Sequence, residues 1–167
     1  MPSEIQARGR LSLHQIGSKI RSGQKIFLRH NHPNGFLGVN WQGKYHLAYV
    51  MSSWNPSTNQ FRVLWARKGK SMHTVETLTS SDQVLLLNNN NDLDGDGDNI
   101  LNAHVSVDHD SQYGMVYAAQ IVDVLHGDFL NVNIKWESTR ETQNVYLSRL
   151  FVELKNEKRK RTVTNML

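Results

Sequence analysis

Short runs of alternating hydrophobic and polar residues, separated by turn-forming residues, cover most of this chain. The clearest series lies in the second half, where runs rich in β-branched and aromatic residues span 114–124, 129–137 and 143–150. The turn signals between them lie at 126–128 and 138–140. Such runs are typical of short β-strands joined by tight turns. The pattern therefore predicts a small antiparallel barrel or meander.

The same pattern occurs once more, earlier in the chain. The step from Ala48 to Trp65 is 17 positions, and the step from Ala119 to Trp136 is also 17 positions. A β-rich segment follows each Trp at nearly the same distance. A repeat of this kind usually indicates two copies of one supersecondary unit. We therefore expect two units, each with a central strand that ends on a Trp.

The pattern predicts an all-β protein with one short helix over about 11–21. Leu13, Ile16 and Ile20 have helical spacing there, and Gly23 is a plausible stop. We predict two five-stranded SH3-like barrels in tandem. The predicted organisation is a basic leader 1–23, a first barrel 24–87, a linker 88–98, a second barrel 99–154 and a basic tail 155–167. The expected strands are 25–30, 45–54, 60–68, 73–78 and 83–87 in the first unit, and 99–108, 114–124, 129–137, 144–150 and 151–154 in the second.

The segment 88–98 is composed of Asn, Asp and Gly with a single Leu, so it cannot bury much apolar surface. Its alternating carboxylates resemble part of an EF-hand calcium loop. The pattern then fails, because Ala103 stands where the bidentate Glu is needed and Asn99 stands where an apolar residue is usual. We interpret the segment as an exposed acidic linker, and we expect no metal and no cofactor.

Charge is segregated along the chain. Residues 1–72 hold eleven Lys and Arg against one acid, residues 73–154 hold three against thirteen, and residues 155–167 hold five against one. The asymmetry suggests an anionic partner for the first part and a cationic partner for the second. Attraction between the two parts is an equally simple explanation, and both remain open.

Composition and motifs exclude several function classes. The chain has no cysteine, which removes disulfides, thiolate metal sites and a Cys nucleophile and fits a reducing intracellular compartment. No apolar run approaches the roughly 18–20 residues of a membrane span, and the N-terminus lacks the apolar segment of a secretory signal. Phosphate-binding Gly-rich loops, GxSxG and HExxH are absent from the sequence. We therefore expect a non-catalytic protein.

Each predicted unit has a small residue followed by an aliphatic step, Ala48-Tyr49-Val50 and Ala119-Gln120-Ile121, and an aromatic residue at the end of its third strand. In these features residues 24–154 resemble tandem Tudor domains of the Royal family. The resemblance implies a nuclear, non-catalytic chromatin reader that takes a methylated lysine or arginine, usually on a histone tail, into an aromatic cage. A methylated ammonium keeps its charge but is weakly hydrated, so each aromatic face contributes roughly 0.5–2 kcal/mol.

The resemblance also implies the cage residues. In the second unit they are Tyr113, Tyr117 and Trp136, with Glu137 as the acid. In the first unit the corresponding residues are Trp41, Tyr45 and Trp65, but Ala66 and Arg67 follow where an acid would help. The alternative for both Trp residues is an ordinary core position, because each is in phase with the aliphatic residues that precede it on its strand.

The basic first part is expected to lie against nucleic-acid phosphates. Such contacts are independent of sequence and weaken steeply with salt. The tail 156–161, NEKRKR, is compatible with a nuclear-import signal. A protein that binds DNA or RNA only, without a cage, is a further alternative. The residues expected to contact phosphates are Arg8, Arg10, Lys19, Arg21, Arg67, Lys68 and Lys70.

A different fold is also compatible with the first unit, which resembles one repeat of a MIR-type β-trefoil. Residues 82–137 can supply a second repeat, but only about 30 residues, 138–167, remain for a third that needs about 40. A trefoil would bind carbohydrate or protein surfaces and would use the aromatic residues as core.

Overall fold

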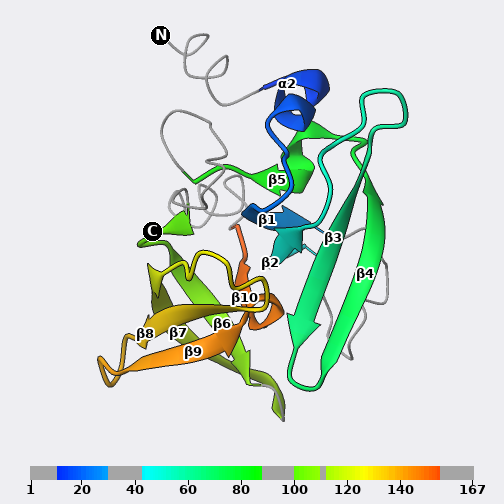
Figure 1. Ribbon diagram of the computed structural model, residues 1–167. Coiled ribbons are helices and arrows are strands. Elements are labelled where there is room, and N and C mark those ends of the chain that lie inside the picture. Colours follow the sequence, from blue (N-terminus) through cyan, green and yellow to red (C-terminus); the bar gives the residue numbers. More distant parts are fainter. Residues whose placement is uncertain (1–10, 30–42, 88–99, 110–111, 155–167) are drawn as a thin grey trace, which may run out of the picture.

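The computed structural model describes residues 11–29, 43–87, 100–109 and 112–154, without the side chains of 112–114. Their architecture is all-β, as predicted, and consists of a strongly curled antiparallel sheet of ten strands (Figure 1). Within these residues, no helix is long and apolar enough to cross a membrane. Several of the predicted features lie outside the described residues. They are the linker 88–98 with its calcium-like pattern, Trp41, Arg8, Arg10 and the basic tail.

The elements follow the predicted order. One helix, α2 (Leu13–Ser18), precedes the strands, and two short 3-10 helices interrupt them. The first set of strands is β1 (Lys25–Arg29), β2 (Tyr45–Val50), β3 (Gln60–Arg67), β4 (Lys70–Thr77) and, after η1 (Ser81–Gln83), β5 (Val84–Leu85). The second set is β6 (His104–His109), β7 (Gln112–Asp123), β8 (Asn131–Trp136), β9 (Thr142–Tyr146) and, after η3 (Leu147–Arg149), β10 (Leu150–Val152).

One pairing scheme occurs twice. In each set, consecutive strands form an antiparallel meander, a 3-10 turn follows the fourth strand, and a short fifth strand returns to pair with the first. These are the pairs β1–β5 and β6–β10. The scheme is that of a small five-stranded barrel, and the described strands repeat it two times rather than the three times that a trefoil requires.

The 17-residue step in the sequence is a hairpin register. Ala119 on β7 is the cross-strand partner of Trp136 on β8. On β2 and β3, Tyr49 pairs with Leu64 and Val50 with Val63, a register that places Ala48 opposite Trp65. A small residue therefore lies beside each Trp, where a larger one would compete for the same space.

Helix α2 packs on the first set of strands. Ser12 caps it, because its Oγ accepts a hydrogen bond from the Gln15 amide (3.1 Å) and the Gln15 Oε1 accepts one from the Ser12 amide (2.8 Å). Ile16 and Ile20 are almost fully buried in the first core. Trp54, which is 9% exposed, packs against the helix where Gly17 leaves room for its indole ring.

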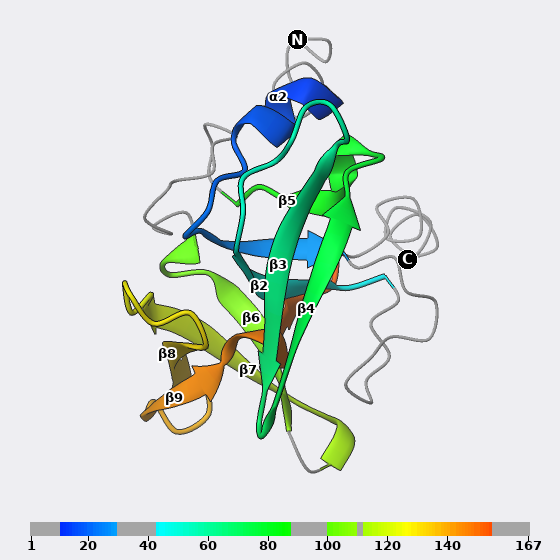
Figure 2. The ribbon, with the colours of Figure 1, turned by 45° about the vertical axis from the view of Figure 1, so that its right-hand side comes forward.

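Strands β1 and β2 of the first set contribute side chains to both cores, because their side chains are buried on both faces. Ile26 and Leu28 on one face of β1 belong to the first core, while Phe27 on the other face belongs to the second. On β2, Val50 and Leu47 divide in the same way. Because β10 also pairs with β2, a single continuous sheet runs through both sets (Figures 1 and 2).

Polar side chains reinforce this junction. Arg67, only 4% exposed, donates from Nη1 to the Ser148 carbonyl (3.0 Å) and lies 3.7 Å from Oδ2 of buried Asp108. The Lys25 ammonium donates to the carbonyls of Val124, Leu125 (3.0 Å) and Asn131 (3.1 Å). The first and second sets of strands are thus tied by buried hydrogen bonds as well as by apolar packing.

Candidate functional site

A pocket of about 340 Å³ lies at one end of the second set of strands. It opens between the end of β8, the turn that leads to β9, and the outer part of β7. Aromatic, acidic and hydroxyl side chains form its wall together with one arginine. The lining residues are His109, Tyr117, Trp136, Ser138, Thr139, Glu141, Gln143 and Arg149.

Trp136 is placed by the alternation of β8. Val132 and Ile134, four and two residues earlier on the same face, are fully buried in the second core, whereas Trp136 at the strand end is only partly buried. Its indole Nε1 donates to Oε1 of Gln143 on β9 (3.0 Å). The ring therefore has a fixed orientation, with one part on the core and another part in the pocket wall.

Tyr117 completes an aromatic corner with Trp136. The two ring centroids are 6.2 Å apart and the ring planes meet at 83°. Tyr117 is 42% exposed, so its ring is accessible from the pocket. In this edge-to-face geometry the edge of one ring points toward the face of the other, and the aromatic faces that border the corner between them can attract a weakly hydrated cation.

The acid in the pocket wall is Glu141, and not the predicted Glu137. Glu137 is the first residue of the turn after β8 (Asn131–Trp136), and it is not among the residues that line the pocket. Its carboxylate instead lies 3.1 Å from Nδ1 of His104. Tyr113 belongs to β7, but its side chain is not among those described. Of the four predicted residues, the structure therefore brings together Tyr117 and Trp136.

The sequence did not predict four of the residues that line the pocket. They are Glu141, Gln143, His109 and Arg149. A signal for Glu141 was present, because the turn predicted at 138–140 returns the chain opposite Trp136, and the Trp136 amide donates to the Glu141 carbonyl (2.9 Å). The guanidinium of Arg149 is held on the protein, where its Nε donates to the Asp108 carbonyl (2.8 Å). No sequence pattern marked that contact.

The first set of strands does not form the second predicted cage from Tyr45 and Trp65. Trp65 is fully buried in the first core, and its Nε1 donates to Oγ1 of Thr74 (2.8 Å). Tyr45 belongs to the second core and is 6% exposed. The two rings thus serve as core residues of different clusters, because they sit on opposite faces of neighbouring strands.

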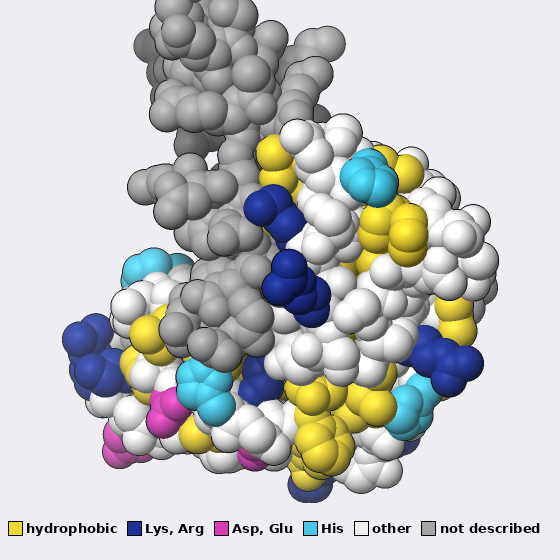
Figure 3. Space-filling view, turned by 45° about the horizontal axis from the view of Figure 1, so that its top comes forward, with side chains coloured by type: hydrophobic (Ala, Val, Ile, Leu, Met, Phe, Trp, Pro, Cys, Tyr) yellow, Lys and Arg dark blue, Asp and Glu magenta, His cyan; other side chains and the backbone are white. Residues whose placement is uncertain are grey.

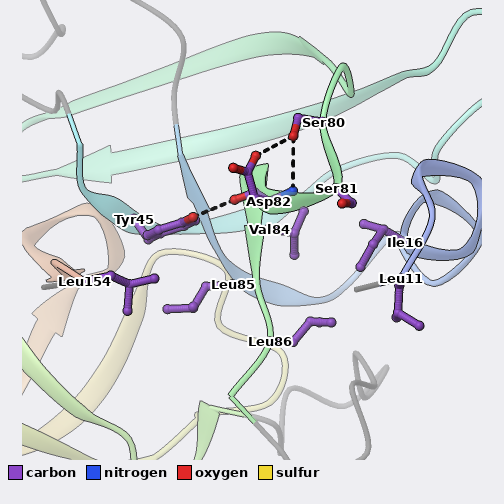
Figure 4. Close-up of a pocket in the computed structure, with 10 residues that line it drawn as sticks. All are labelled: Leu11, Ile16, Tyr45, Ser80, Ser81, Asp82, Val84, Leu85, Leu86 and Leu154. Carbon is purple, nitrogen blue, oxygen red and sulfur yellow. Dashed lines mark hydrogen bonds between the residues drawn. The ribbon is translucent and has the colours of Figure 1, made fainter. Parts of the chain in front are cut away.

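Tyr45 also lines a larger cavity of about 600 Å³ between α2, β5 and the end of β10 (Figure 4). Its hydroxyl donates to the Asp82 carbonyl (2.6 Å), and the guanidinium of Arg29 lies over its ring at 5.6 Å. Burial raises the pKa of this phenol. The guanidinium of Arg29 already occupies the face of the Tyr45 ring, so this ring is not available to a ligand cation. Leucines, Ile16 and Val84 form most of the remaining wall, as the labelled side chains in Figure 4 show.

The predicted phosphate-contacting residues that the structure describes differ in their exposure. Arg67 is corrected to a structural residue, because it is buried against Ser148 and Asp108 and cannot reach a phosphate. Lys68 and Lys70 are exposed at the β3–β4 hairpin turn, and Arg21 is exposed after α2. Lys19 is partly buried as the C-cap of α2. On the face shown in Figure 3, Lys and Arg side chains occupy separate places and form no continuous patch.

Within the described residues, no group of three or more His, Asp or Glu side chains could hold a metal ion.

No protein-family model matches the chain, and no curated protein matches it at a significant level. Among solved structures, it matches the crystal structure of Arabidopsis thaliana AGDP1 AGD34 with 12% sequence identity and a TM-score of 0.33. The match covers 83% of this chain and 85% of that one. A likeness at this level carries no conclusion about function.

Proposed function

We propose that this protein is a non-catalytic reader that binds a methylated lysine or arginine of a basic peptide, such as a histone tail, in the nucleus. The ligand cation would lie in the pocket of Tyr117, Trp136 and Glu141. The observation that carries the proposal is the perpendicular pair of accessible aromatic rings beside a carboxylate.

The chemistry of the pocket suits a methylated cation better than an unmodified one. An unmodified lysine ammonium is strongly hydrated and would lose that hydration without gaining three directed acceptors from the wall. A methylated ammonium has little hydration to lose and gains roughly 0.5–2 kcal/mol per aromatic face. Glu141, exposed at the rim, adds a charge–charge term that salt screens.

We propose that the pocket binds its ligand without catalysing a reaction. Ser138 and Thr139 carry hydroxyls, but a nucleophile needs a base within hydrogen-bond reach and a third group that orients the base. Among the described residues, the Thr139 hydroxyl accepts a hydrogen bond from the Glu141 amide (3.2 Å), a contact within the turn. Arg149 and Gln143 are already bonded to the protein, which is typical of a rigid binding wall.

The test is calorimetric titration with histone-tail peptides that differ only in methylation of one lysine or arginine, read in parallel by tryptophan fluorescence. We expect the chain to bind one methylated form and to prefer it over the unmodified peptide by roughly tenfold or more. Trp136→Ala should abolish that preference. Phe129→Ala is the matched control, because Phe129 is an exposed aromatic residue (47%) outside the pocket wall. Equal binding of methylated and unmodified peptides would contradict the proposal.

We further propose an auxiliary contact with nucleic acid through Lys68 and Lys70. These two lysines flank Gly69 in an exposed hairpin turn, on the part of the chain that holds eleven Lys and Arg against one acid. Binding of a DNA duplex of arbitrary sequence should weaken steeply with salt, and the Lys68→Glu, Lys70→Glu double variant should reduce the salt slope by about two. Duplex affinity that is unchanged in this variant would remove the contact.

A further inference from the structure

The inner part of strand β7 pairs with two strands, β6 and β8, whereas its outer part pairs with β6 alone among the described residues. It runs from Gln112 to Asp123 and pairs with β6 regularly from Gln120 to Val116, and again at Gln112 after a register shift. Its pairing with β8 begins only at Ala119. In Figures 1 and 2 the β6–β7 hairpin accordingly extends past β8 and β9. Within the described residues, the outer part of β7 is therefore a sheet edge on the side of β8.

The backbone direction along this edge follows from two contacts. The Ala118 carbonyl accepts a hydrogen bond from the Glu137 amide (3.1 Å), so the polar backbone groups of Ala118 point toward β8. The backbone N–H and C=O of Tyr117 point toward β6, where Val107 is its cross-strand partner. Because direction alternates along a strand, the N–H and the C=O of Val116 point to the same side as those of Ala118. Opposite Val116 there is no β8 residue, because β8 ends at Trp136 and the chain turns away at Ser138.

Resting on the proposed function, we propose that the methylated peptide binds as an extended strand along this edge of β7. The peptide would take the line that β8 would follow if it continued beyond Glu137. One peptide residue would then exchange both backbone hydrogen bonds with Val116. Addition of a strand to an exposed sheet edge is a general mode of peptide recognition.

The register of such a strand delivers a side chain to the pocket. Trp136 lies opposite Ala119 on the inner face, and Tyr117 is two residues further out on that same face of β7. A peptide residue opposite Tyr117 therefore points to the face of Tyr117 and Trp136, where the pocket lies. It would form a pair without backbone hydrogen bonds, the kind in which side chains come closest.

The chemistry of the edge fits this occupant. Met115, Val116 and Tyr117 are 43%, 46% and 42% exposed, and none of them is charged. Natural sheet edges are usually blunted by charged side chains, proline, a bulge or a cover. The register shift between β6 and β7 lies beyond Val116, so the uncharged stretch from Val116 to Ala118 is left for strand addition. A basic peptide is favoured over other strands because Glu141, an exposed carboxylate, lies in the wall of the pocket to which this edge leads.

The experiment measures amide hydrogen exchange at Val116 and peptide affinity together. The probes are a Lys- and Arg-rich histone-tail peptide with one central trimethyllysine, and the single capped amino acid acetyl-trimethyllysine amide, which has no flanking backbone. Val116→Pro removes the edge N–H at a position that does not bond to β6, where proline is tolerated. Val116→Ala shortens the side chain and keeps the N–H. Circular dichroism and the melting temperature verify that both variants fold.

We expect the Val116 amide of the wild-type protein to become protected on peptide binding and to stay unprotected with the capped amino acid. Val116→Pro should weaken peptide binding on the order of tenfold, while Val116→Ala binds as the wild type does. The capped amino acid should bind all three proteins equally. These results would support strand addition.

Two other outcomes are distinct. Peptide binding that leaves the Val116 amide unprotected, or that Val116→Pro does not weaken, would overturn strand addition and leave the reader function intact. Failure of the wild-type protein to bind both probes and every other methylated lysine or arginine peptide of the titration panel would overturn both the reader function and strand addition. Because the exchange measurement uses the wild-type protein, the inference stays testable even if Val116→Pro does not fold.

Discussion

The indole Nε1 of Trp136 donates a hydrogen bond of 3.0 Å to Oε1 of Gln143, so a residue of β9 sets the orientation of the ring that ends β8. A cation–π site depends on this orientation, because only the face of a ring attracts a cation. Gln143 therefore acts as a positioning residue for the proposed cage.

Gln143→Ala should weaken binding of a methylated peptide by roughly three- to tenfold, the equivalent of one lost hydrogen bond. Titration calorimetry checks this. Gln143→Glu retains an acceptor at the same place and should restore most of the affinity. An alanine variant that binds as tightly as wild type would show that packing alone holds the ring.

Glu141 and Glu137 offer a matched pair of carboxylates. Glu141 lines the pocket, whereas Glu137 lies 3.1 Å from His104. We expect Glu141→Gln to weaken methylated-peptide binding by about two- to fivefold at low salt, because an exposed charge pair is worth about 0.2–1 kcal/mol. Glu137→Gln should leave affinity unchanged. The two affinities, measured at low and at high salt, decide which acid serves the cage, and the reverse order would return that role to Glu137.

The two repeat tryptophans should behave in opposite ways. Trp65 is fully buried, so Trp65→Ala should cost about 3–5 kcal/mol of unfolding free energy. Trp136 is only partly buried, so Trp136→Ala should cost about 1–2 kcal/mol. Denaturant unfolding at pH 7 checks both values. Similar losses would mean that Trp136 is a core residue as much as Trp65 is, which would weaken its assignment to the cage.

The sequence pattern predicts the elements well and the site less well. The strands were recognisable because their side chains alternate between core and solvent. The predicted strand 144–150 was wrong in part, since η3 replaces its second half and buries both Leu147 and Ser148, two neighbours that a strand would place on opposite faces. The predicted helix 11–21 is also shorter, at Leu13–Ser18.

Local periodicity cannot separate Trp65 from Trp136. Both follow two inward-facing aliphatic or aromatic residues on a central strand, and both lie opposite an alanine. Their difference in exposure comes from tertiary surroundings that adjacent residues do not encode. The same holds for Arg67, which sequence reasoning placed among phosphate contacts. Its buried bonds to Ser148, 81 positions away, come from the junction of the two sets of strands.

Gly17 should be essential for the packing of α2. An alanine in a helix is ordinarily favourable by about 1 kcal/mol relative to glycine. Here a Cβ would overlap the indole ring of Trp54, which is buried beneath the helix. We expect Gly17→Ala to lower the unfolding free energy by about 1–3 kcal/mol, the usual cost of overpacking. Ser18→Ala, at an exposed position of the same helix, should change it by less than about 0.5 kcal/mol. Thermal and denaturant unfolding of the two variants provide the test.

Stability should fall in mild acid because of His46. This residue is fully buried on β2, where burial lowers its pKa from 6.5 to about 4. Asp108, with Oδ2 3.9 Å from the His46 Nε2, partly opposes the shift, while Arg67 and Lys44 add to it, and the ring of Phe151 packs against the imidazole.

The folded pKa of His46 lies below the unfolded value, so the unfolded chain binds the extra proton between about pH 6.5 and pH 4. The contribution of neutral His46 is fully present above pH 6.5 and is lost as the pH falls toward 4, by at most about 3 kcal/mol. Urea unfolding at pH 7, 5.5 and 4.5 should show this decline, and His46→Phe should flatten it. Because His46 lies where β2 meets β10, Asp108 and Arg67, a decline that persists unchanged in His46→Phe would transfer the acid sensitivity to other groups of the protein.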